Sequence, residues 1–112
     1  MKQLFLCLCC VTAGYFATAQ VDNDVLSIRK LLLEQVVAWN NGDVTGYMQG
    51  YWHSDSLVFI GSNGPNYGFD ATLKRYKEHY PDAAHMGHLK STIVDMKKLS
   101  DDYYFIIGKW AL

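Results

Sequence analysis

Cysteine is scarce in this chain and is confined to one end of it. All three cysteines, Cys7, Cys9 and Cys10, fall within the first ten of the 112 residues. The rest of the chain therefore folds without a disulfide, even in a compartment that would allow one. Its stability must come from a packed core. The composition permits such a core, because 50% of the residues are apolar and 14% are aromatic, and the length suits a single domain.

Clustered basic charge is also missing. Removing Lys2 from the ten basic residues leaves nine against eleven acidic ones, so residues 20–112 carry a formal charge of −2. No basic run is longer than Lys97-Lys98. Domains that bind nucleic acid usually present a basic face, and we therefore expect no nucleic-acid partner.

The common catalytic and cofactor motifs are absent from the sequence. No serine, histidine and aspartate stand in a recognisable triad order, and no cysteine follows residue 10 to act as a nucleophile. The glycines of 61–64 precede Pro65 and no lysine-bearing helix follows them, so they predict a turn and not a phosphate-binding loop. We expect no cofactor.

The first nineteen residues have the pattern of a signal peptide. Lys2 provides a positive start, residues 4–13 form an apolar run, and Ala17-Thr18-Ala19 supplies small residues at the cleavage spacing. We expect cleavage after Ala19 and export to the periplasm or the extracellular space. The apolar run is shorter than the ~20 residues that span a bilayer, so no stable membrane anchor should remain. A lipid on a leader cysteine is the alternative, although leucine or cysteine, and no small residue, precedes each one.

Two helices are predicted at the start of the mature chain. Apolar residues recur at steps of three and four, the spacing of one helical face, at Val25, Ile28, Leu32, Val36 and Trp39. Asn23 or Asp24 can cap this helix, and Gly42 in Asn40-Asn41-Gly42 can end it. Asp43 can then cap a shorter helix that runs to about Gln49.

The middle of the chain predicts a strand, a loop and a third helix. Residues 57–60 are β-branched and aromatic, and turn-forming residues follow at 61–66. The third helix carries one aromatic face until Pro81 stops it. That face consists of Phe69, Leu73, Tyr76 and Tyr80, and the predicted outer face consists of Lys74, Arg75, Lys77 and Glu78.

The last part of the chain predicts an antiparallel hairpin. Two extended stretches, 88–99 and 103–112, are joined by the polar turn 100–102. Both faces of the second stretch are apolar, as expected when one face covers helices and the other lines a cavity. The fold class is therefore α+β.

Short sequence segments occur in a characteristic order along these elements: 38–43, 51–52, 55–57, 59–61, Gly68, 72–73, Tyr76 and 108–110. The segments and the order of elements together resemble the nuclear transport factor 2-like superfamily, and in particular its SnoaL-like, uncharacterised exported branch. The resemblance spans nearly all of residues 20–112. It implies a cone-shaped, curved antiparallel sheet wrapped around a long N-terminal helix, a cystatin-like α-β(2)-α-β roll. Members normally have one or two more strands after the position of Leu112, so we expect a C-terminally incomplete copy with its last strand or strands missing.

Aromatic side chains are the clearest sign of a ligand site. They fall on elements that converge in this fold, and ligand pockets are typically apolar and aromatic with a few polar groups. The alternative for each ring is that it fills the core. Trp52, Tyr76 and Tyr80 are the preferred pocket residues. The full predicted lining is Trp39, Tyr51, Trp52, Phe59, Tyr76, Tyr80 and Trp110, and Tyr47 belongs to the same aromatic set.

Two residues are candidates for acid–base chemistry. Asp55 precedes the first strand, where a carboxylate inside an apolar cavity would have a raised pKa; the alternative is a carboxylate that caps a turn. His88 is expected to point into the cavity. In the steroid isomerase branch the proton-shuttling carboxylate resembles a position near the end of this strand, but here that position falls in Phe59-Ile60-Gly61 and no base stands there.

A spacing of three among His79, Asp82, His85 and His88 suggests a metal site, since imidazole and carboxylate bind zinc. However, the stretch that holds these four residues includes the end of a predicted helix, Pro81, a loop and the start of a predicted strand. They share no common face, so we expect no metal.

Three functions follow from these observations. The leading hypothesis is an exported domain that binds a small apolar or aromatic molecule. The second is an isomerase, dehydratase or cyclase that uses acid–base chemistry in the cavity. The third is an association module that oligomerises through its sheet face, and a homodimer is expected of the complete domain.

Overall fold

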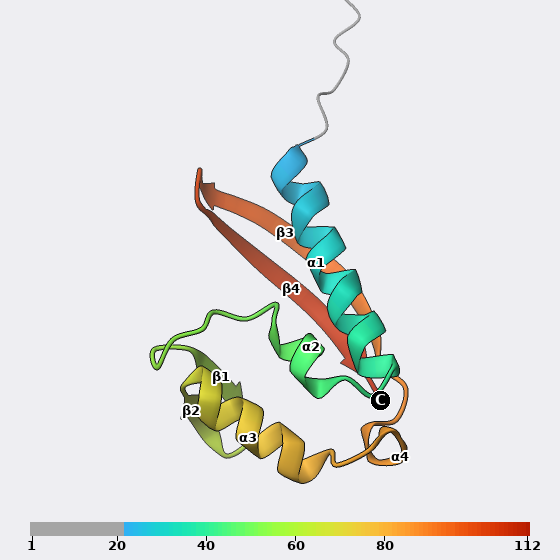
Figure 1. Ribbon diagram of the computed structural model, residues 1–112. Helices are drawn as coiled ribbons and strands as arrows, with labels where there is room; N and C mark the ends of the chain where they lie inside the picture. The colour runs from blue at the N-terminus through green and yellow to red at the C-terminus, as the bar shows by residue number, and fades with distance from the viewer. Residues whose placement is uncertain (1–21) are drawn as a thin grey trace, which may run out of the picture.

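The computed structural model describes residues 22–112, in which eight elements follow one another (Figure 1). Their bounds are α1 Asn23–Asn40, α2 Val44–Met48, β1 Val58–Gly61, β2 Gly64–Tyr67, α3 Phe69–His79, α4 Ala83–Met86, β3 Lys90–Ser100 and β4 Tyr103–Ala111. The predicted signal peptide and the three cysteines lie outside the described residues. In the described part, no helix is both long enough and apolar enough to cross a bilayer.

Helix α1 forms where the apolar periodicity predicted it. Its cap differs from the expectation, because the carboxylate of Asp22, and not Asn23 or Asp24, accepts a hydrogen bond from the first turn, at 2.9 Å from the Asp24 nitrogen. Gly42 ends the helix as predicted, at a φ of +77° that favours glycine. The predicted face is buried or half-buried along its length, at Val25, Ile28, Leu32, Val36 and Trp39.

Trp39 forms the centre of the core. It is 4% exposed, and its indole Nε1–H donates to the carbonyl of Met86 at 3.0 Å. Its ring meets the rings of Tyr47 and Tyr80 edge to face, with centroids 5.0 and 4.9 Å apart. The buried core around it consists of Trp39, Val44, Met86 and Leu89. This core therefore lies where the end of α1, α2, α4 and the start of β3 meet.

Asn40, which follows Trp39 at the end of α1, fixes the start of β3. The Asn40 amide is paired with the backbone of Leu89: its Oδ1 accepts from the Leu89 N–H at 2.7 Å, and its Nδ2 donates to the Leu89 carbonyl at 3.1 Å. Both backbone groups precede the strand and have no ladder partner there. The amide side chain thus replaces two strand hydrogen bonds at the point where the chain enters β3.

The segment predicted as a loop at 61–66 contains a strand, so that prediction is wrong. β1 and β2 form a tight antiparallel hairpin in which Gly61 pairs with Gly64 and Ile60 with Pro65. Gly64 has a φ of +94°, which suits the turn. Proline is tolerated because the strand is at a sheet edge, where its missing N–H removes no ladder bond. Three of the four residues of β2, Gly64, Pro65 and Asn66, are types that usually form turns, which masked the short strand in the sequence.

The second missed element is α4. Asp82 caps it by accepting from the His85 N–H at 2.9 Å, and Gly87 at φ +65° ends it. The single turn has almost no periodicity of its own. It forms because Met86, which is 1% exposed, is buried against Trp39.

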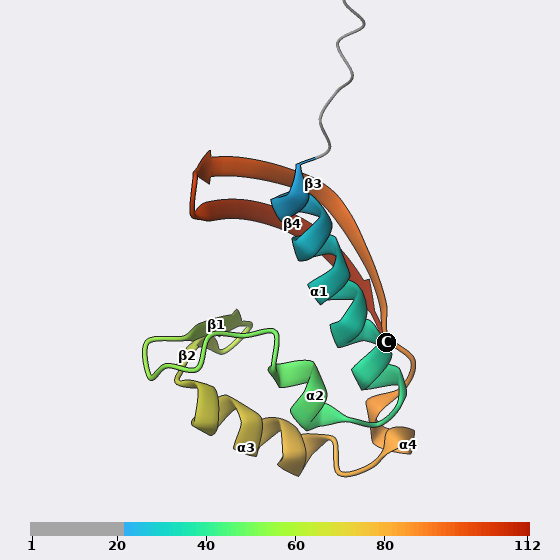
Figure 2. The ribbon, with the colours of Figure 1, turned by 45° about the horizontal axis from the view of Figure 1, so that its top comes forward.

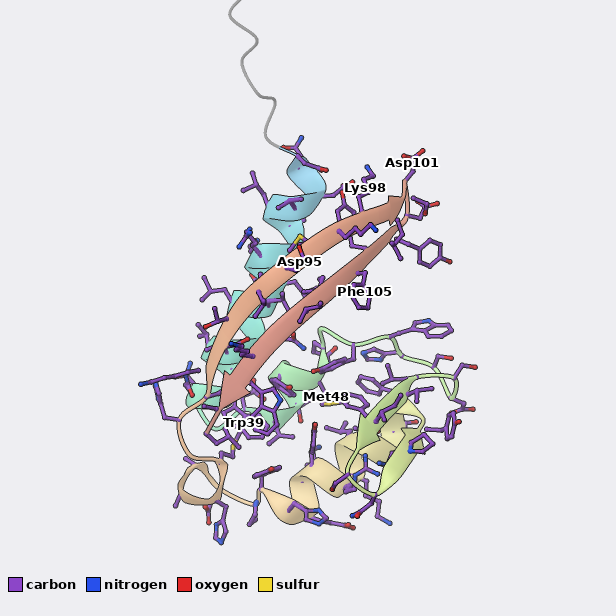
Figure 3. The ribbon with its side chains drawn as sticks, turned by 180° about the vertical axis from the view of Figure 1, so that it is seen from behind. Trp39, Met48, Asp95, Lys98, Asp101 and Phe105 are labelled. Carbon is purple, nitrogen blue, oxygen red and sulfur yellow. The ribbon has the colours of Figure 1, made fainter. Side chains whose placement is uncertain are left out.

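The β3–β4 hairpin runs beside α1 and curves along its length (Figure 2). The register shifts once between Ile93 and Asp95 and again between Lys98 and Ser100, and such bulges increase bending. At the far end the Tyr104 hydroxyl donates to Asp22 at 2.9 Å, which ties the hairpin to the start of α1. Figure 3 shows Lys98 and Asp101 at this tip and Trp39 and Met48 at the opposite end.

The two faces of β4 differ from the prediction that one covers helices and the other lines a cavity. A single face does both: Tyr104 reaches α1, while Ile106 and Trp110 reach the cavity. The opposite face is open to solvent. Its exposed apolar side chains are Tyr103, Phe105 and Ile107.

The mixture of helices and antiparallel strands is the predicted α+β class. Within residues 22–112 the strands form two separate two-stranded sheets, β1–β2 and β3–β4, and no ladder joins them. The single curved sheet of the expected cone is therefore not present in this part of the chain. The core around Trp39 joins the two sheets at one end of the space between them.

Replacing Trp39 with alanine should lower the free energy of unfolding by about 3 to 5 kcal/mol, since the ring is buried and its removal leaves a cavity. Chemical denaturation of the two proteins measures this. Trp52→Ala is the matched control, because Trp52 is 65% exposed, and it should cost less than about 0.5 kcal/mol. A loss below about 1 kcal/mol for Trp39→Ala would contradict the central role of Trp39.

Candidate functional site

A cavity of about 680 Å³ opens between α1, the β3–β4 hairpin and the unit formed by β1, β2 and α3. This volume is typical of sites for small organic ligands. Helix α1 supplies one wall through Leu32, Gln35, Val36 and Trp39. The remaining lining is Tyr47, Tyr51, Phe59, Ile60, Gly61, Asn66, Arg75, Tyr76, Tyr80, Leu89, Ser91, Thr92, Ile93, Ile106, Gly108, Lys109, Trp110 and Leu112.

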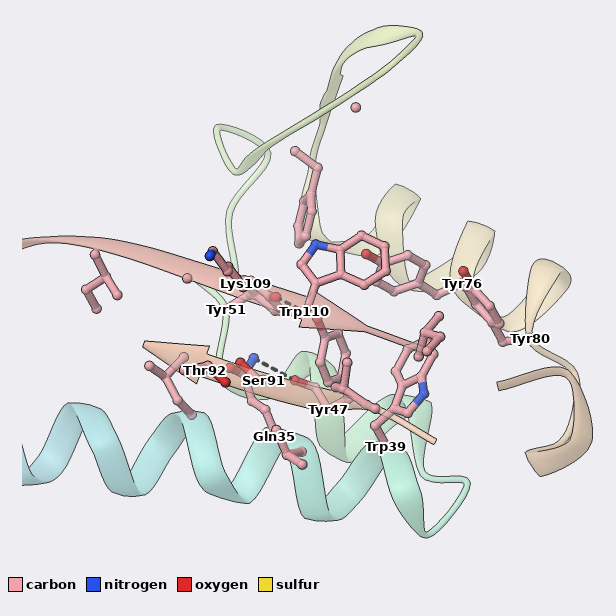
Figure 4. A pocket seen from close by; sticks show the side chains of 18 of the residues that line it. Gln35, Trp39, Tyr47, Tyr51, Tyr76, Tyr80, Ser91, Thr92, Lys109 and Trp110 are labelled. Atoms are coloured by element: carbon pink, nitrogen blue, oxygen red, sulfur yellow. Dashed lines mark hydrogen bonds between the residues drawn. The ribbon is translucent and has the colours of Figure 1, made fainter. Parts of the chain in front are cut away.

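Aromatic rings make up much of this lining (Figure 4). Tyr76 and Tyr80 project from α3 on one side, and Trp110 enters from β4 on the other. The Tyr51 ring lies 4.8 Å from Phe59, and the Phe59 ring lies 6.1 Å from Tyr76. Trp110 is 74% exposed despite lining the cavity, so it stands at the open mouth. Its indole is therefore available to a ligand without first leaving the core.

A small polar group lies within the aromatic wall. The Tyr47 and Tyr51 hydroxyls are 2.9 Å apart and hydrogen-bonded. Gln35, which is buried, donates from Nε2 to the Tyr47 carbonyl at 3.0 Å and so holds α2 against α1 (Figure 4). One hydrogen of the hydroxyl pair is used between the two tyrosines. The other remains free to donate to a ligand.

The tyrosine hydroxyls of the cavity are harder to ionise than usual. Burial raises the pKa of Tyr51, and burial together with the nearby Tyr51 hydroxyl raises that of Tyr47. Burial, followed by the Tyr47 and Tyr80 hydroxyls, raises the pKa of Tyr76 to about 12, while the Arg75 guanidinium opposes the shift. At neutral pH these hydroxyls are therefore neutral hydrogen-bonding groups and not bases.

The structure places six of the seven predicted pocket residues at the cavity: Trp39, Tyr51, Phe59, Tyr76, Tyr80 and Trp110. Trp52 is the exception, because it is 65% exposed and does not line the cavity. Tyr51 ends the turn after α2 and points its ring inward toward Tyr47. Since the chain bends at this point, its neighbour Trp52 faces the solvent.

Neither candidate catalytic residue lies at the cavity. Asp55 is exposed in the turn before β1, and its backbone borders Gly68. His88 is exposed between α4 and β3, and the next residue, Leu89, lines the cavity in its place. The expectation that His88 points inward is thus wrong, because the extended backbone alternates its side chains and Asn40 fixes Leu89.

The four residues with metal-like spacing are dispersed. Asp82 and His85 contact each other at 2.6 Å as part of the α4 cap. The His79 ring lies against the Arg75 carbonyl at 2.8 Å, at the end of α3. In the part of the chain that the structure describes, no three histidine, cysteine, aspartate or glutamate side chains gather where they could hold a metal.

Six polar residues of the described lining were not predicted: Gln35, Asn66, Arg75, Ser91, Thr92 and Lys109. Gln35 occupies the apolar face of α1, three residues after Leu32, and a polar residue at that position is a signal that could have been used. Arg75 was assigned to the outer face of α3, but it is half-buried, lines the cavity and donates from Nη1 to the Asn66 Oδ1 at 2.9 Å. Lys109 borders the cavity although strand alternation places it on the face of Tyr103, Phe105 and Ile107, so alternation gave no signal for it.

Comparison with solved structures gives one informative similarity. The chain is similar to an NTF-2-like protein of unknown function from Shewanella oneidensis MR-1, with 41% sequence identity and a TM-score of 0.75. The alignment covers 78% of this chain and 72% of that one. No family model matches the sequence, and no curated protein matches it significantly.

Stability should fall as the pH rises above about 10. The folded state keeps Tyr76 protonated up to about pH 12, whereas the unfolded state releases this proton near pH 10. The stabilisation from Tyr76 is thus complete below about pH 10 and is lost as the pH rises from there through about 12.

Chemical denaturation at several alkaline pH values measures this loss. Tyr76→Phe should show a shallower decline, because the titrating hydroxyl is gone. Tyr67→Phe, which removes an exposed hydroxyl, should decline as the wild type does. An equally steep decline in Tyr76→Phe would show that this hydroxyl ionises as freely in the folded state as in the unfolded state.

Proposed function

The chain belongs to the nuclear transport factor 2-like superfamily, and within this fold we propose that it binds a small apolar or aromatic molecule in the cavity beside α1. The observation that supports this most directly is the concentration of aromatic rings around an open space of about 680 Å³. Sites of this size and composition enclose most of a small ligand and use a few polar groups to orient it. The hydroxyl pair of Tyr47 and Tyr51 would be one such group.

The leader pattern of residues 1–19 supports export as part of the same proposal. A binding protein outside the cytoplasm would meet its ligand directly, without a transport step. The absence of cysteine from residues 11–112 also means that an oxidising compartment cannot introduce a disulfide within this region.

The acid–base alternative has little support from the cavity. Within residues 22–112 the lining contains no aspartate, glutamate, histidine or cysteine side chain. The cavity tyrosines remain protonated at neutral pH. They can donate hydrogen bonds to a developing charge, but they cannot remove a proton as a general base.

Ligand binding can be tested by thermal shift against a library of apolar and steroid-like compounds. A compound that binds the cavity should raise the melting temperature of the wild type. Trp110→Ala should weaken its binding by about tenfold, because the indole at the mouth loses its contact with the ligand. Tyr103→Ala is the matched control, since Tyr103 lies on the opposite face of the same strand and is 70% exposed. It should bind as the wild type does.

Two results would contradict the proposal. One is a library in which no compound stabilises the folded protein. The other is a set of compounds whose affinities are unchanged by Trp110→Ala and reduced by Tyr103→Ala, which would place the binding surface on the outer face of the hairpin.

A second candidate function, self-association, is favoured by that outer face. Its exposed apolar residues on β4 are Tyr103, Phe105 and Ile107, and their partners across the hairpin are Ser100, Lys97 and Asp95. A row of exposed apolar side chains is a candidate interaction site, and a second copy of this chain would bury the same row in a symmetric pair. Cavity binding and association through this face are compatible, because they use opposite sides of β4.

For the second candidate we expect a dimer by size-exclusion chromatography with light scattering. Phe105→Lys should convert it to a monomer, because a charge in the centre of an apolar interface would be buried without a partner. Trp52→Lys places the same charge on an exposed residue away from this face and should leave the dimer intact. A monomeric wild type at micromolar concentration would exclude this association.

A further inference from the structure

The charge distribution of the cavity differs from that of the whole chain. Residues 20–112 carry more acidic than basic side chains. The described lining nevertheless contains a half-buried basic side chain, Arg75, and no aspartate or glutamate. No acidic side chain of the described lining therefore offsets the Arg75 charge at the cavity wall.

Arg75 is held at the cavity wall by neutral partners. Its Nη1–H donates to the Asn66 Oδ1 at 2.9 Å and its Nη2–H reaches the Thr72 hydroxyl at 3.5 Å. Within residues 22–112 it lies within ion-pair distance of no carboxylate. A guanidinium has five N–H donors, so donors remain after these two contacts. The neutral partners fix its orientation without cancelling its charge.

A half-buried guanidinium without a counter-charge loses part of its hydration free energy, and hydrogen bonds to neutral partners compensate only part of that loss. Arg75 lines the same cavity as the aromatic residues Tyr76 and Tyr80. An anion bound at this point would have Arg75 on one side and the aromatic rings on the other.

We propose that the ligand of this cavity is a ring-bearing carboxylic acid whose carboxylate pairs with Arg75 while its apolar rings pack against Trp110 and Tyr76. This inference rests on the proposed function of the cavity. A carboxylate fits better than a doubly charged phosphate, because one guanidinium matches its two oxygens and balances its single charge. The neutral tyrosine hydroxyls of the cavity present no repulsion to the carboxylate.

The test compares two probes of nearly equal shape, 2-naphthoate and its uncharged amide, 2-naphthamide, by isothermal titration calorimetry near neutral pH. The wild type should bind 2-naphthoate about tenfold more tightly, which is the usual effect of one hydrogen-bonded charge pair. Arg75→Gln should remove this preference by weakening 2-naphthoate while leaving 2-naphthamide unchanged. Arg75→Lys should retain part of it.

Lys77→Gln is the matched control, because it removes the same charge from an exposed position two residues along α3. It should keep the full preference for the carboxylate. Circular dichroism of each variant verifies the fold, and the wild-type comparison of the two probes needs no variant at all.

The outcomes separate the two proposals. Equal binding of both probes by the wild type, or a preference that survives Arg75→Gln, would overturn the carboxylate assignment and leave the binding cavity intact. Binding of neither probe to the folded wild type, with no stabilisation by any library compound, would overturn the binding function and the assignment together.

Discussion

The burial of Trp39 is the constraint on which the rest of the structure depends. One turn of α1 connects four other elements. The Trp39 indole N–H holds α4 at Met86, and the ring packs against Tyr47 of α2 and Tyr80 at the end of α3. The next residue, Asn40, fixes the start of β3. With no disulfide available, these contacts are what orient the hairpin relative to α3. The cavity is the space that this orientation leaves beside α1.

Much of the fold could be predicted because its signals are local. The apolar face of α1 follows from spacing alone, and the glycine at 42 and the aspartate at 43 mark a helix end and a helix start through their own backbone preferences. The hairpin of β3 and β4 is likewise visible in its alternation and turn. The resemblance to the superfamily added the expectation that the aromatic elements converge, which sequence spacing could not supply.

The missed features depend on contacts between distant segments. Helix α4 has a single turn and exists because Met86 packs beneath Trp39. The short strand β2 is hidden by residues that usually form turns, and pairing with β1 decides its conformation. Arg75 was misplaced because its neighbours on α3 are solvent-exposed lysines, whereas its own position is set by Asn66 on another element. Trp52 was predicted to line the pocket because it is aromatic, but its side chain points to the solvent.

The division of the strands into two unconnected hairpins has a mechanical consequence. The walls of the cavity are β1–β2 with α3 on one side and β3–β4 on the other, and they are joined near Trp39 at one end. Within residues 22–112, moving the free ends apart would break no ladder hydrogen bond. A change in the spacing of these free ends would therefore alter the width of the cavity while the packing around Trp39 and both strand ladders stay in place.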